Sequence, residues 1–259
     1  KPVSASVMFD TLMQVLGRPQ LGGSASLVQG DDPQAQCPAL AGVRLLVAED
    51  NELNQQVALE LLRETGAQVD LARNGEEAVA LVRRHRYDLV LMDMQMPVLD
   101  GLEATRQLRA QPALAQLPIV AMTANAMDAD RQRCLDAGMN DHLAKPVVPE
   151  RLWAVLQRWC GEGAVAATGG APEACRQTVP SEQGATTVLP APLPGLDQGA
   201  GLRNALGRPA FYAEVLQRFA AHYADGAQRM AQALAEARMD ILQREAHTLR
   251  GLAGTIGAT

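Results

Sequence analysis

The chain has few aromatic residues, few cysteines and no long apolar run. Only 3% of its 259 residues are aromatic, which disfavours a surface on which nucleobases stack. Its net charge of −6 would repel duplex DNA and an anionic membrane surface. No apolar run reaches the roughly 18 residues of a membrane span, and no secretory signal opens the chain. These absences predict no nucleic-acid partner and no direct membrane contact.

The few cysteines are scattered along the chain, at Cys37, Cys134, Cys160 and Cys175. No two of them stand at a short metal-ligand spacing, and nothing suggests a disulfide framework. Reduced thiols are typical of the cytosol. We therefore predict a cytoplasmic location for this segment.

Two stretches rich in small and polar residues divide the chain into structured parts. Residues 18–42 are rich in Gly, Ser, Gln and Pro, and residues 162–194 in Gly, Ala, Pro, Thr and Ser. Such compositions are typical of linkers. Between them, residues 43–161 alternate strand and helix patterns, and residues 195–259 follow as a helical part.

A short internal repeat marks the start of the chain. The triplet Lys1-Pro2-Val3 recurs as Lys145-Pro146-Val147, and the apolar register of the helical pattern that follows is kept at the same offset. We predict that residues 1–17 are the C-terminal end of a preceding domain of the same type as the middle one. The chain begins with Lys1 and ends within a helical pattern, so we expect it to be part of a longer protein.

The middle part contains five strand-like runs separated by helical patterns. The runs are almost continuously apolar, as expected when helices cover both faces of a parallel sheet. The predicted strands are Val43–Ala48, Val69–Ala72, Leu89–Met92, Ile119–Met122 and His142–Ala144. The predicted helices are Asn54–Thr65, Gly75–Arg84, Leu102–Ala110, Asp128–Asp136 and Glu150–Trp159. This pattern predicts an α/β domain with a doubly wound, five-stranded parallel sheet.

Polar side chains follow four of these strands. The first strand ends in Glu49-Asp50, the third in Asp93, the fourth in Thr123 and the fifth in Lys145. Ligands of open parallel sheets bind at the carboxyl ends of the strands. Clustered carboxylates repel one another unless a cation joins them, and a few oxygen ligands suit Mg²⁺. Because a carboxylate can form an acyl phosphate, the pattern indicates Mg²⁺-assisted phosphoryl transfer to Asp93.

This ordered set of motifs resembles the receiver domain of two-component response regulators, over residues 43–161. The matching motifs are Glu49-Asp50, Asp93 with Met96-Pro97, Asp100-Gly101, Thr123-Ala124 and Lys145-Pro146. The resemblance implies a flavodoxin-like fold with Asp93 as the phosphoacceptor. It also implies that Mg²⁺ is held by Glu49, Asp50, Asp93 and the backbone carbonyl of Gln95, and that the phosphoryl oxygens contact Thr123 and Lys145.

His142 departs from the receiver pattern, because Tyr or Phe is usual three residues before the lysine. We expect a packed or partly exposed ring at this position.

One histidine of the helical part stands apart from its buried stripe. The stripe repeats at three- and four-residue spacing and comprises Leu242, Ala246, Leu249, Ala253 and Ile256. His247 lies off it, beside Arg250, Gly251 and Gly254 on the helix surface. Glycine within a helix costs about 1 kcal/mol relative to alanine, so two glycines on one face indicate room for a partner. We expect the His247 imidazole to face solvent.

The stretch Ala246–Gly251, with Gly257-Ala258 after it, resembles the histidine phosphotransfer domain. That family is a four-helix bundle with an exposed phosphoacceptor histidine, which maps to His247. Arg250 keeps the charge of a lysine that is common in the family. At least one bundle helix is missing from residues 195–259, so we expect an incomplete, loosely packed all-α bundle.

The order of receiver, linker and phosphotransfer domain resembles the C-terminal part of a hybrid sensor histidine kinase. The resemblance implies a phosphorelay from a histidine kinase core of the same parent chain to Asp93, then to His247, then to a separate response regulator. The parent would be anchored in the inner membrane. No ATP-binding motif of a kinase core is present, so we expect no ATP binding by this segment.

Two alternatives stay open. A receiver that only binds could gate the kinase without turning phosphate over. A haloacid dehalogenase-type phosphatase would also use a strand-end aspartate and Mg²⁺, but its pattern has a second Asp two residues on, where this chain has Gln95.

Overall fold

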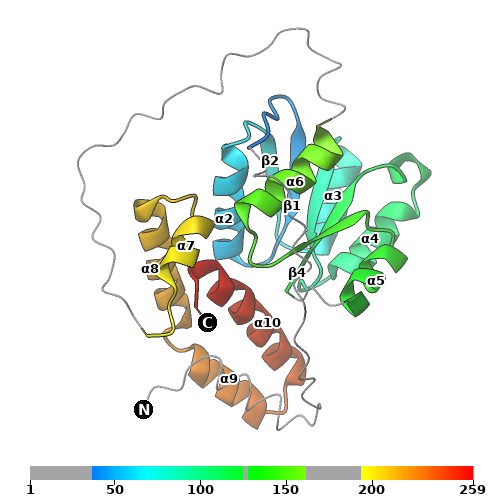
Figure 1. Cartoon of the computed structure of the whole chain (residues 1–259). Helices are drawn as coiled ribbons and strands as arrows, with labels where there is room; N and C mark the ends of the chain where they lie inside the picture. Colours follow the sequence, from blue (N-terminus) through cyan, green and yellow to red (C-terminus); the bar gives the residue numbers. More distant parts are fainter. Residues whose placement is uncertain (1–36, 125–127, 162–193, 259) are drawn as a thin grey trace.

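The computed structural model describes residues 37–124, 128–161 and 194–258. They form an α/β domain and a set of helices that lies against it (Figure 1). The predicted half-domain at residues 1–17 lies outside the described residues, as does most of both predicted linkers.

The α/β domain contains five parallel strands in the order β2-β1-β3-β4-β5. Their bounds are β1 Arg44–Ala48, β2 Gln68–Ala72, β3 Leu89–Asp93, β4 Ile119–Thr123 and β5 Asp141–Ala144. This confirms the predicted doubly wound sheet. The strand order reverses between the neighbouring strands β1 and β3, which is where a crevice forms at the carboxyl edge of such a sheet.

Helices cover both faces of the sheet, as the apolar strands require. Their bounds are α2 Glu52–Arg63, α3 Gly75–Arg84, α4 Gly101–Arg109, α5 Asp128–Asp136 and α6 Pro149–Cys160. Alternate strand residues supply two separate cores: Leu45 and Val47 join one apolar cluster, whereas Leu46 joins the other. Successive side chains of a strand point to opposite faces, so one buried strand contributes to both cores.

The C-terminal part contains four helices, α7 Gln198–Asn204, α8 Pro209–Tyr223, α9 Gly226–Ala235 and α10 Met239–Ile256. The apolar spacing of Met230, Leu234, Ala237 and Ile241 predicts a single amphipathic helix, and this prediction is wrong. The chain turns at Ala237, whose φ of 54° is left-handed, so Ile241 belongs to the next helix. Apolar spacing alone does not reveal such a turn, because the spacing continues across it.

The helical part packs on the face of the sheet that α2 and α6 cover. Phe211 and Tyr212 of α8 and Leu252 and Ile256 of α10 belong to the same apolar cluster as Leu61 of α2. Figure 1 shows α10 running past the carboxyl ends of the strands. The helical part therefore shares a core with the α/β domain.

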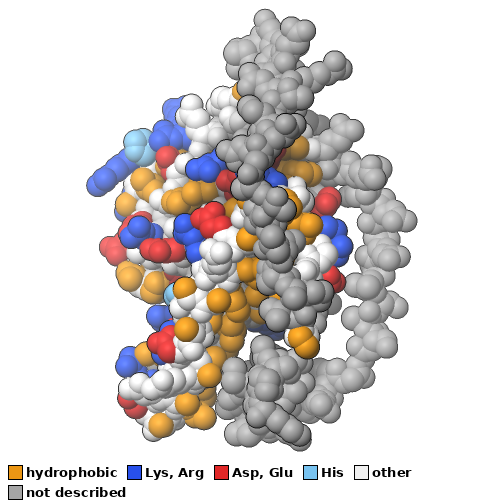
Figure 2. All heavy atoms as spheres, turned by 90° about the vertical axis from the view of Figure 1, so that its left-hand side faces the viewer, with side chains coloured by type: hydrophobic (Ala, Val, Ile, Leu, Met, Phe, Trp, Pro, Cys, Tyr) orange, Lys and Arg blue, Asp and Glu red, His pale blue; other side chains and the backbone are white. Residues whose placement is uncertain are grey.

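Part of the helical surface remains apolar. A band of hydrophobic side chains runs through the lower half of the face seen in Figure 2, and Leu234 of α9 is 50% exposed. Along α10, Leu242 and Ile256 are buried, whereas Ala246, Leu249 and Ala253 are half-buried. No described helix is long and apolar enough to cross a membrane.

Candidate functional site

Three carboxylates meet where β1 and β3 end. Glu49 and Asp50 directly follow β1, and Asp93 is the last residue of β3. One carboxylate oxygen from each lies within 4.8 Å of the others. Asp93 is 1% exposed and Glu49 is 2% exposed. The structure therefore brings together the three acidic residues that the sequence had singled out.

Lys145 neutralises part of this cluster. It follows β5, and its Nζ donates to Glu49 Oε2 at 2.6 Å and to Asp93 Oδ2 at 2.7 Å. The Lys145 side chain is 5% exposed. A buried ammonium is stable only when paired in this way, so the residue joins the two strand ends electrostatically.

Two residues of α2 hold Glu49, and the sequence analysis had missed both. Asn54 Nδ2 donates to Glu49 Oε1 at 2.7 Å, and Gln55 Nε2 donates to the Glu49 backbone carbonyl at 2.5 Å. Their position in the first turn of a helix that starts at the sheet edge was a usable signal. These two bonds hold the carboxylate and the backbone of Glu49 in place.

Gly101 allows the loop after β3 to return to the site. A Cβ at this position would lie 2.0 Å from the Asp93 backbone oxygen. The Gly101 N–H donates to the Met94 carbonyl, and Asp100 caps α4 through the Glu103 N–H. The Asp100-Gly101 motif thus keeps the backbone at the start of α4 close to that of Asp93.

Burial dominates the acid–base behaviour of the cluster. It raises the pKa of Asp93 and that of Glu49, although the Lys145 ammonium opposes both shifts. Burial and then the Glu49 charge raise the pKa of Asp50 to about 6. Burial lowers the pKa of Lys145, but Glu49 and Asp93 more than offset this and raise it overall. When all three carboxylates are ionised, the Lys145 ammonium compensates one of their charges and leaves two uncompensated.

The donor set fits a divalent metal ion. Three buried or half-buried carboxylate oxygens converge, and the two uncompensated charges equal the charge of Mg²⁺. The Gln95 backbone reaches the same place, because its N–H donates to Asp93 Oδ1 at 3.3 Å.

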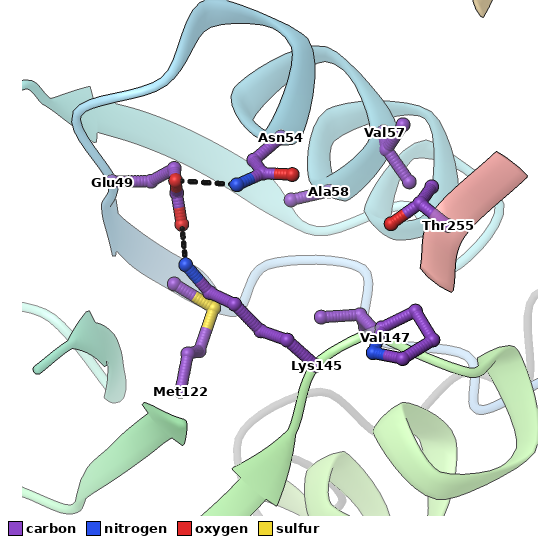
Figure 3. Close-up of a pocket in the computed structure, with 9 residues that line it drawn as sticks. Glu49, Asn54, Val57, Ala58, Met122, Lys145, Val147 and Thr255 are labelled. Atoms are coloured by element: carbon purple, nitrogen blue, oxygen red, sulfur yellow. Dashed lines mark hydrogen bonds and ion pairs between the residues drawn. The ribbon is translucent and has the colours of Figure 1, made fainter. Parts of the chain in front are cut away.

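Helix α10 lies over this edge of the sheet, with Gly251 and Gly254 against the loop after β5. A Cβ at Gly251 would lie 3.6 Å from Lys145 Cδ, and one at Gly254 would lie 2.9 Å from Pro146 Cδ. Figure 3 shows the contact: Thr255 of α10 faces Val57 of α2, beside the loop that carries Lys145. The glycine face therefore has a partner within the chain, which is the α/β domain itself.

The expectation that His247 faces solvent was wrong. Its Nε2 atom is buried and has no hydrogen-bond partner among the described residues. Burial, followed by the charge of Lys145, lowers the pKa of His247 to about 4. His247 does lie off the buried stripe of α10, as predicted. The surface that covers it comes from residues more than a hundred positions earlier in the chain.

His247 shares a cavity of about 320 Å³ with the strand ends of the α/β domain. Thr123 lines it from the end of β4, Gln95 from the loop after β3, and Arg250 from α10. Thr123 is 2% exposed. The structure thus brings Thr123 and His247 to one space beside the acidic cluster.

His142 lies apart from this cavity. Its side chain is 33% exposed, and its Nδ1 lies 3.7 Å from the Asp141 carboxylate. The ring is partly exposed, as expected.

Comparison with known proteins identifies the family of the α/β domain. The response regulator receiver domain family matches residues 45–157. The polar-differentiation response regulator DivK of Brucella anthropi is 36% identical over 118 residues, which are 46% of this chain and 96% of that protein. The chain belongs to the response regulator receiver family. A second family, the Hpt domain, matches residues 214–259, so the receiver is followed by a histidine phosphotransfer domain.

Some relatives match more of this chain and are much longer. The sensor protein GacS of Pseudomonas syringae pv. syringae is 36% identical over 213 residues, which are 80% of this chain and 22% of that protein. The chain thus spans about a fifth of the length of such curated relatives. A receiver domain of a sensor histidine kinase from Pseudomonas aeruginosa PAO1, solved with a magnesium ion in its active-site cleft, is 50% identical. It covers 47% of this chain and 99% of its own, with a TM-score of 0.45.

The two domains define the class of function. A receiver followed by a phosphotransfer domain, in a chain related to hybrid histidine kinases, is a unit of phosphorelay signal transduction.

Proposed function

We propose that this unit passes a phosphoryl group between Asp93 of the receiver and His247 of the phosphotransfer domain of the same chain. The observation that carries the proposal is the buried, unpartnered His247 Nε2 in a cavity next to the Asp93 site. A buried polar atom without a partner costs about 1–3 kcal/mol. An unpaired Nε2 atom is free to bond to a phosphoryl group, which would account for this cost.

Phosphorylation of Asp93 comes first. A carboxylate oxygen of Asp93 attacks phosphorus, the bond to the donor breaks, and the donor leaves with its electron pair. Lys145 Nζ is 2.7 Å from Asp93 Oδ2, so its charge is placed to contact a phosphoryl oxygen. Thr123 lines the adjoining cavity.

Transfer to His247 then exchanges one bond to phosphorus for another. The Nε2 lone pair attacks, the acyl-phosphate bond breaks, and the Asp93 carboxylate regains its electron pair. The lowered pKa keeps the His247 ring neutral near pH 7, which is the nucleophilic form. Arg250 lines the same cavity and is placed to neutralise the phosphoryl charge during transfer.

We propose Mg²⁺ as the cofactor, held by Glu49, Asp50, Asp93 and the Gln95 carbonyl. The ion would neutralise phosphoryl oxygens that Lys145 and Thr123 do not reach. The support is the convergence of the three carboxylates and their two uncompensated charges.

We further propose the setting of the unit. The phosphoryl donor is the histidine kinase core of a longer parent chain, and the final acceptor is a separate response regulator. The unit acts in the cytoplasm, with the parent anchored in the inner membrane. Its domain limits are residues 43–161 for the receiver and 195–259 for the phosphotransfer part. These limits are supported by the start of β1 at Arg44 and the end of α6 at Cys160.

The alternatives receive less support. A haloacid dehalogenase-type phosphatase needs a carboxylate two residues after its nucleophile, and Gln95 offers only an amide. A binding-only receiver does not account for the complete acidic cluster with its paired lysine.

Labelling with a small phosphodonor tests the proposal. The intact chain is incubated with acetyl phosphate and Mg²⁺ and analysed by mass spectrometry. We expect an acid-stable, base-labile adduct on Asp93, no adduct there in Asp93→Ala, and strong dependence on Mg²⁺. An unchanged adduct in Asp93→Ala would sink the assignment.

A further inference from the structure

A small charged edge borders the contact between the phosphotransfer part and the receiver. Helices α2 and α8 pack against each other, and Val215 of α8 shares an apolar cluster with Val57 of α2. Beside this apolar centre, Gln56 Nε2 of α2 donates to Glu214 Oε1 of α8 at 3.0 Å. One turn further along α2, Glu60 forms an ion pair with Arg208, which directly precedes α8.

The Arg208 guanidinium lies between two receiver carboxylates. Arg208 Nη1 donates a hydrogen bond to Glu60 Oε1 and lies 3.9 Å from Glu64 Oε1. Arg63 Nη1 holds the other oxygen of Glu60 at 3.0 Å. The Glu60 side chain is 14% exposed, although that of Arg208 is 50% exposed. The Glu60 carboxylate is thus also held from within the receiver.

We propose that Arg208 and Glu60 are specificity-determining residues by which the receiver prefers the phosphotransfer part of its own chain. The inference rests on the proposed relay between Asp93 and His247. An apolar face accepts many helical partners, whereas a charge at the edge of an interface rejects a partner of like charge. The acidic edge of α2 selects a partner that carries a cation where α8 begins.

Competition between two acceptors tests this preference. The intact chain is phosphorylated with acetyl phosphate and Mg²⁺ in the presence of a complete phosphotransfer protein from an unrelated relay. Mass spectrometry gives the ratio of label on His247 to label on the foreign histidine. We expect Arg208→Glu to lower this ratio about five- to tenfold, since two carboxylates then repel a third.

The controls separate recognition from folding. A carboxylate at the N-terminus of α8 favours the helix through its dipole, so Arg208→Glu should not unfold it. Arg238→Glu makes the same charge change at the turn between α9 and α10, and we expect the wild-type ratio. The double variant Glu60→Arg/Arg208→Glu should recover at least half of the loss. Equal ratios in Arg208→Glu and Arg238→Glu, or no recovery in the double variant, would overturn the inference.

A measurement without phosphate keeps the inference separate from the relay. Hydrogen exchange of α10 should rise in Arg208→Glu and return towards wild type in the double variant. If the wild-type chain takes no label on Asp93, the proposed function fails, and exchange still decides whether the pair fixes the docking. Unchanged exchange in Arg208→Glu would contradict the pair's role.

Discussion

The receiver and the phosphotransfer part differ in where they bury their apolar residues. The receiver has an apolar core on each face of its sheet: one is entirely its own, and the helical part contributes to the other. The helical part has one small core of its own, built on Met230, Ala233 and Leu242, and its other buried residues join the receiver. The receiver thus keeps one whole core to itself, whereas most buried apolar residues of the helical part lie in the shared core.

The same contrast holds for the two phosphoacceptor candidates. Asp93 is buried among groups of its own domain, with Lys145 and the β3 loop around it. His247 is half-buried, and its buried Nε2 atom belongs to a residue that lines a cavity together with receiver residues. Variants that damage one environment and spare the other test this difference.

The largest effect is expected from Gly101→Ala in the receiver. The new Cβ would meet the Asp93 backbone oxygen at 2.0 Å, and backbone cannot yield as a side-chain tip does. We expect a loss of about 3–5 kcal/mol in the free energy of unfolding of the receiver, measured by urea denaturation. Gly42→Ala is the matched control: its φ of 89° makes it strained, but no atom lies within 4 Å of the new Cβ. A loss no larger than that of the control would contradict the close approach.

Gly254→Ala should separate docking from helix stability. Alanine favours a helix by about 1 kcal/mol over glycine, yet its Cβ would lie 2.9 Å from Pro146 Cδ. We expect a better helix with about tenfold slower transfer from Asp93 to His247, followed by mass spectrometry. Gly251→Ala is the control, because its Cβ would make an ordinary contact at 3.6 Å and transfer should stay within about twofold of wild type. Equal rates in both variants would argue against the docked geometry.

Hydrogen exchange should reveal the unequal cores directly. We expect amides of α9, whose apolar contacts lie in the small core of the helical part, to exchange faster than those of β1 and β3, because local opening is easier where few apolar contacts hold a segment. Protection of α9 equal to that of β3 would refute the expected loose packing.

The smallest effect concerns the ionisation of His247. Its pKa falls from an ordinary value of 6.5 to about 4 through burial and then Lys145, and Arg250 acts in the same direction. Glu49 and Asp130 oppose the shift. Between pH 6.5 and 4 the His247 ring is neutral when the helical part is docked and protonated when it is free. Docking therefore weakens as the pH falls from 6.5 towards 4.

The imidazole resonance of His247, followed by NMR in Mg²⁺-free buffer, measures this directly. We expect a neutral ring at pH 5.5 in the wild-type chain and titration closer to 6.5 in Gly254→Ala. The pH dependence of the free energy of unfolding is less informative, because the raised pKa values of Glu49, Asp50 and Asp93 change it in the opposite direction to His247. Titration of the wild-type ring near 6.5 would contradict its burial.

The receiver was more predictable than the helical part for a physical reason. Strand runs end in Asp93 and Thr123, and in a parallel sheet all strand ends meet at one edge, so local patterns placed distant residues together. The position of Asn54 and Gln55 in the first turn of a helix was a usable signal, but the atoms of Glu49 that they bind depend on side-chain directions, which the pattern does not contain. The pattern also found the glycine face around His247, but the surface that covers it comes from a non-local contact with Lys145 and Pro146.

The most direct test of the account is whether the phosphoryl group moves from Asp93 to His247 within one chain. The intact chain is pulsed with acetyl phosphate and Mg²⁺, quenched at intervals and assayed for acyl phosphate on Asp93 and phosphohistidine on His247. We predict that label on Asp93 decays as label on His247 rises, at a rate independent of protein concentration. Label on Asp93 that reaches a foreign phosphotransfer protein but never His247, or a rate proportional to concentration, would contradict a relay inside the chain.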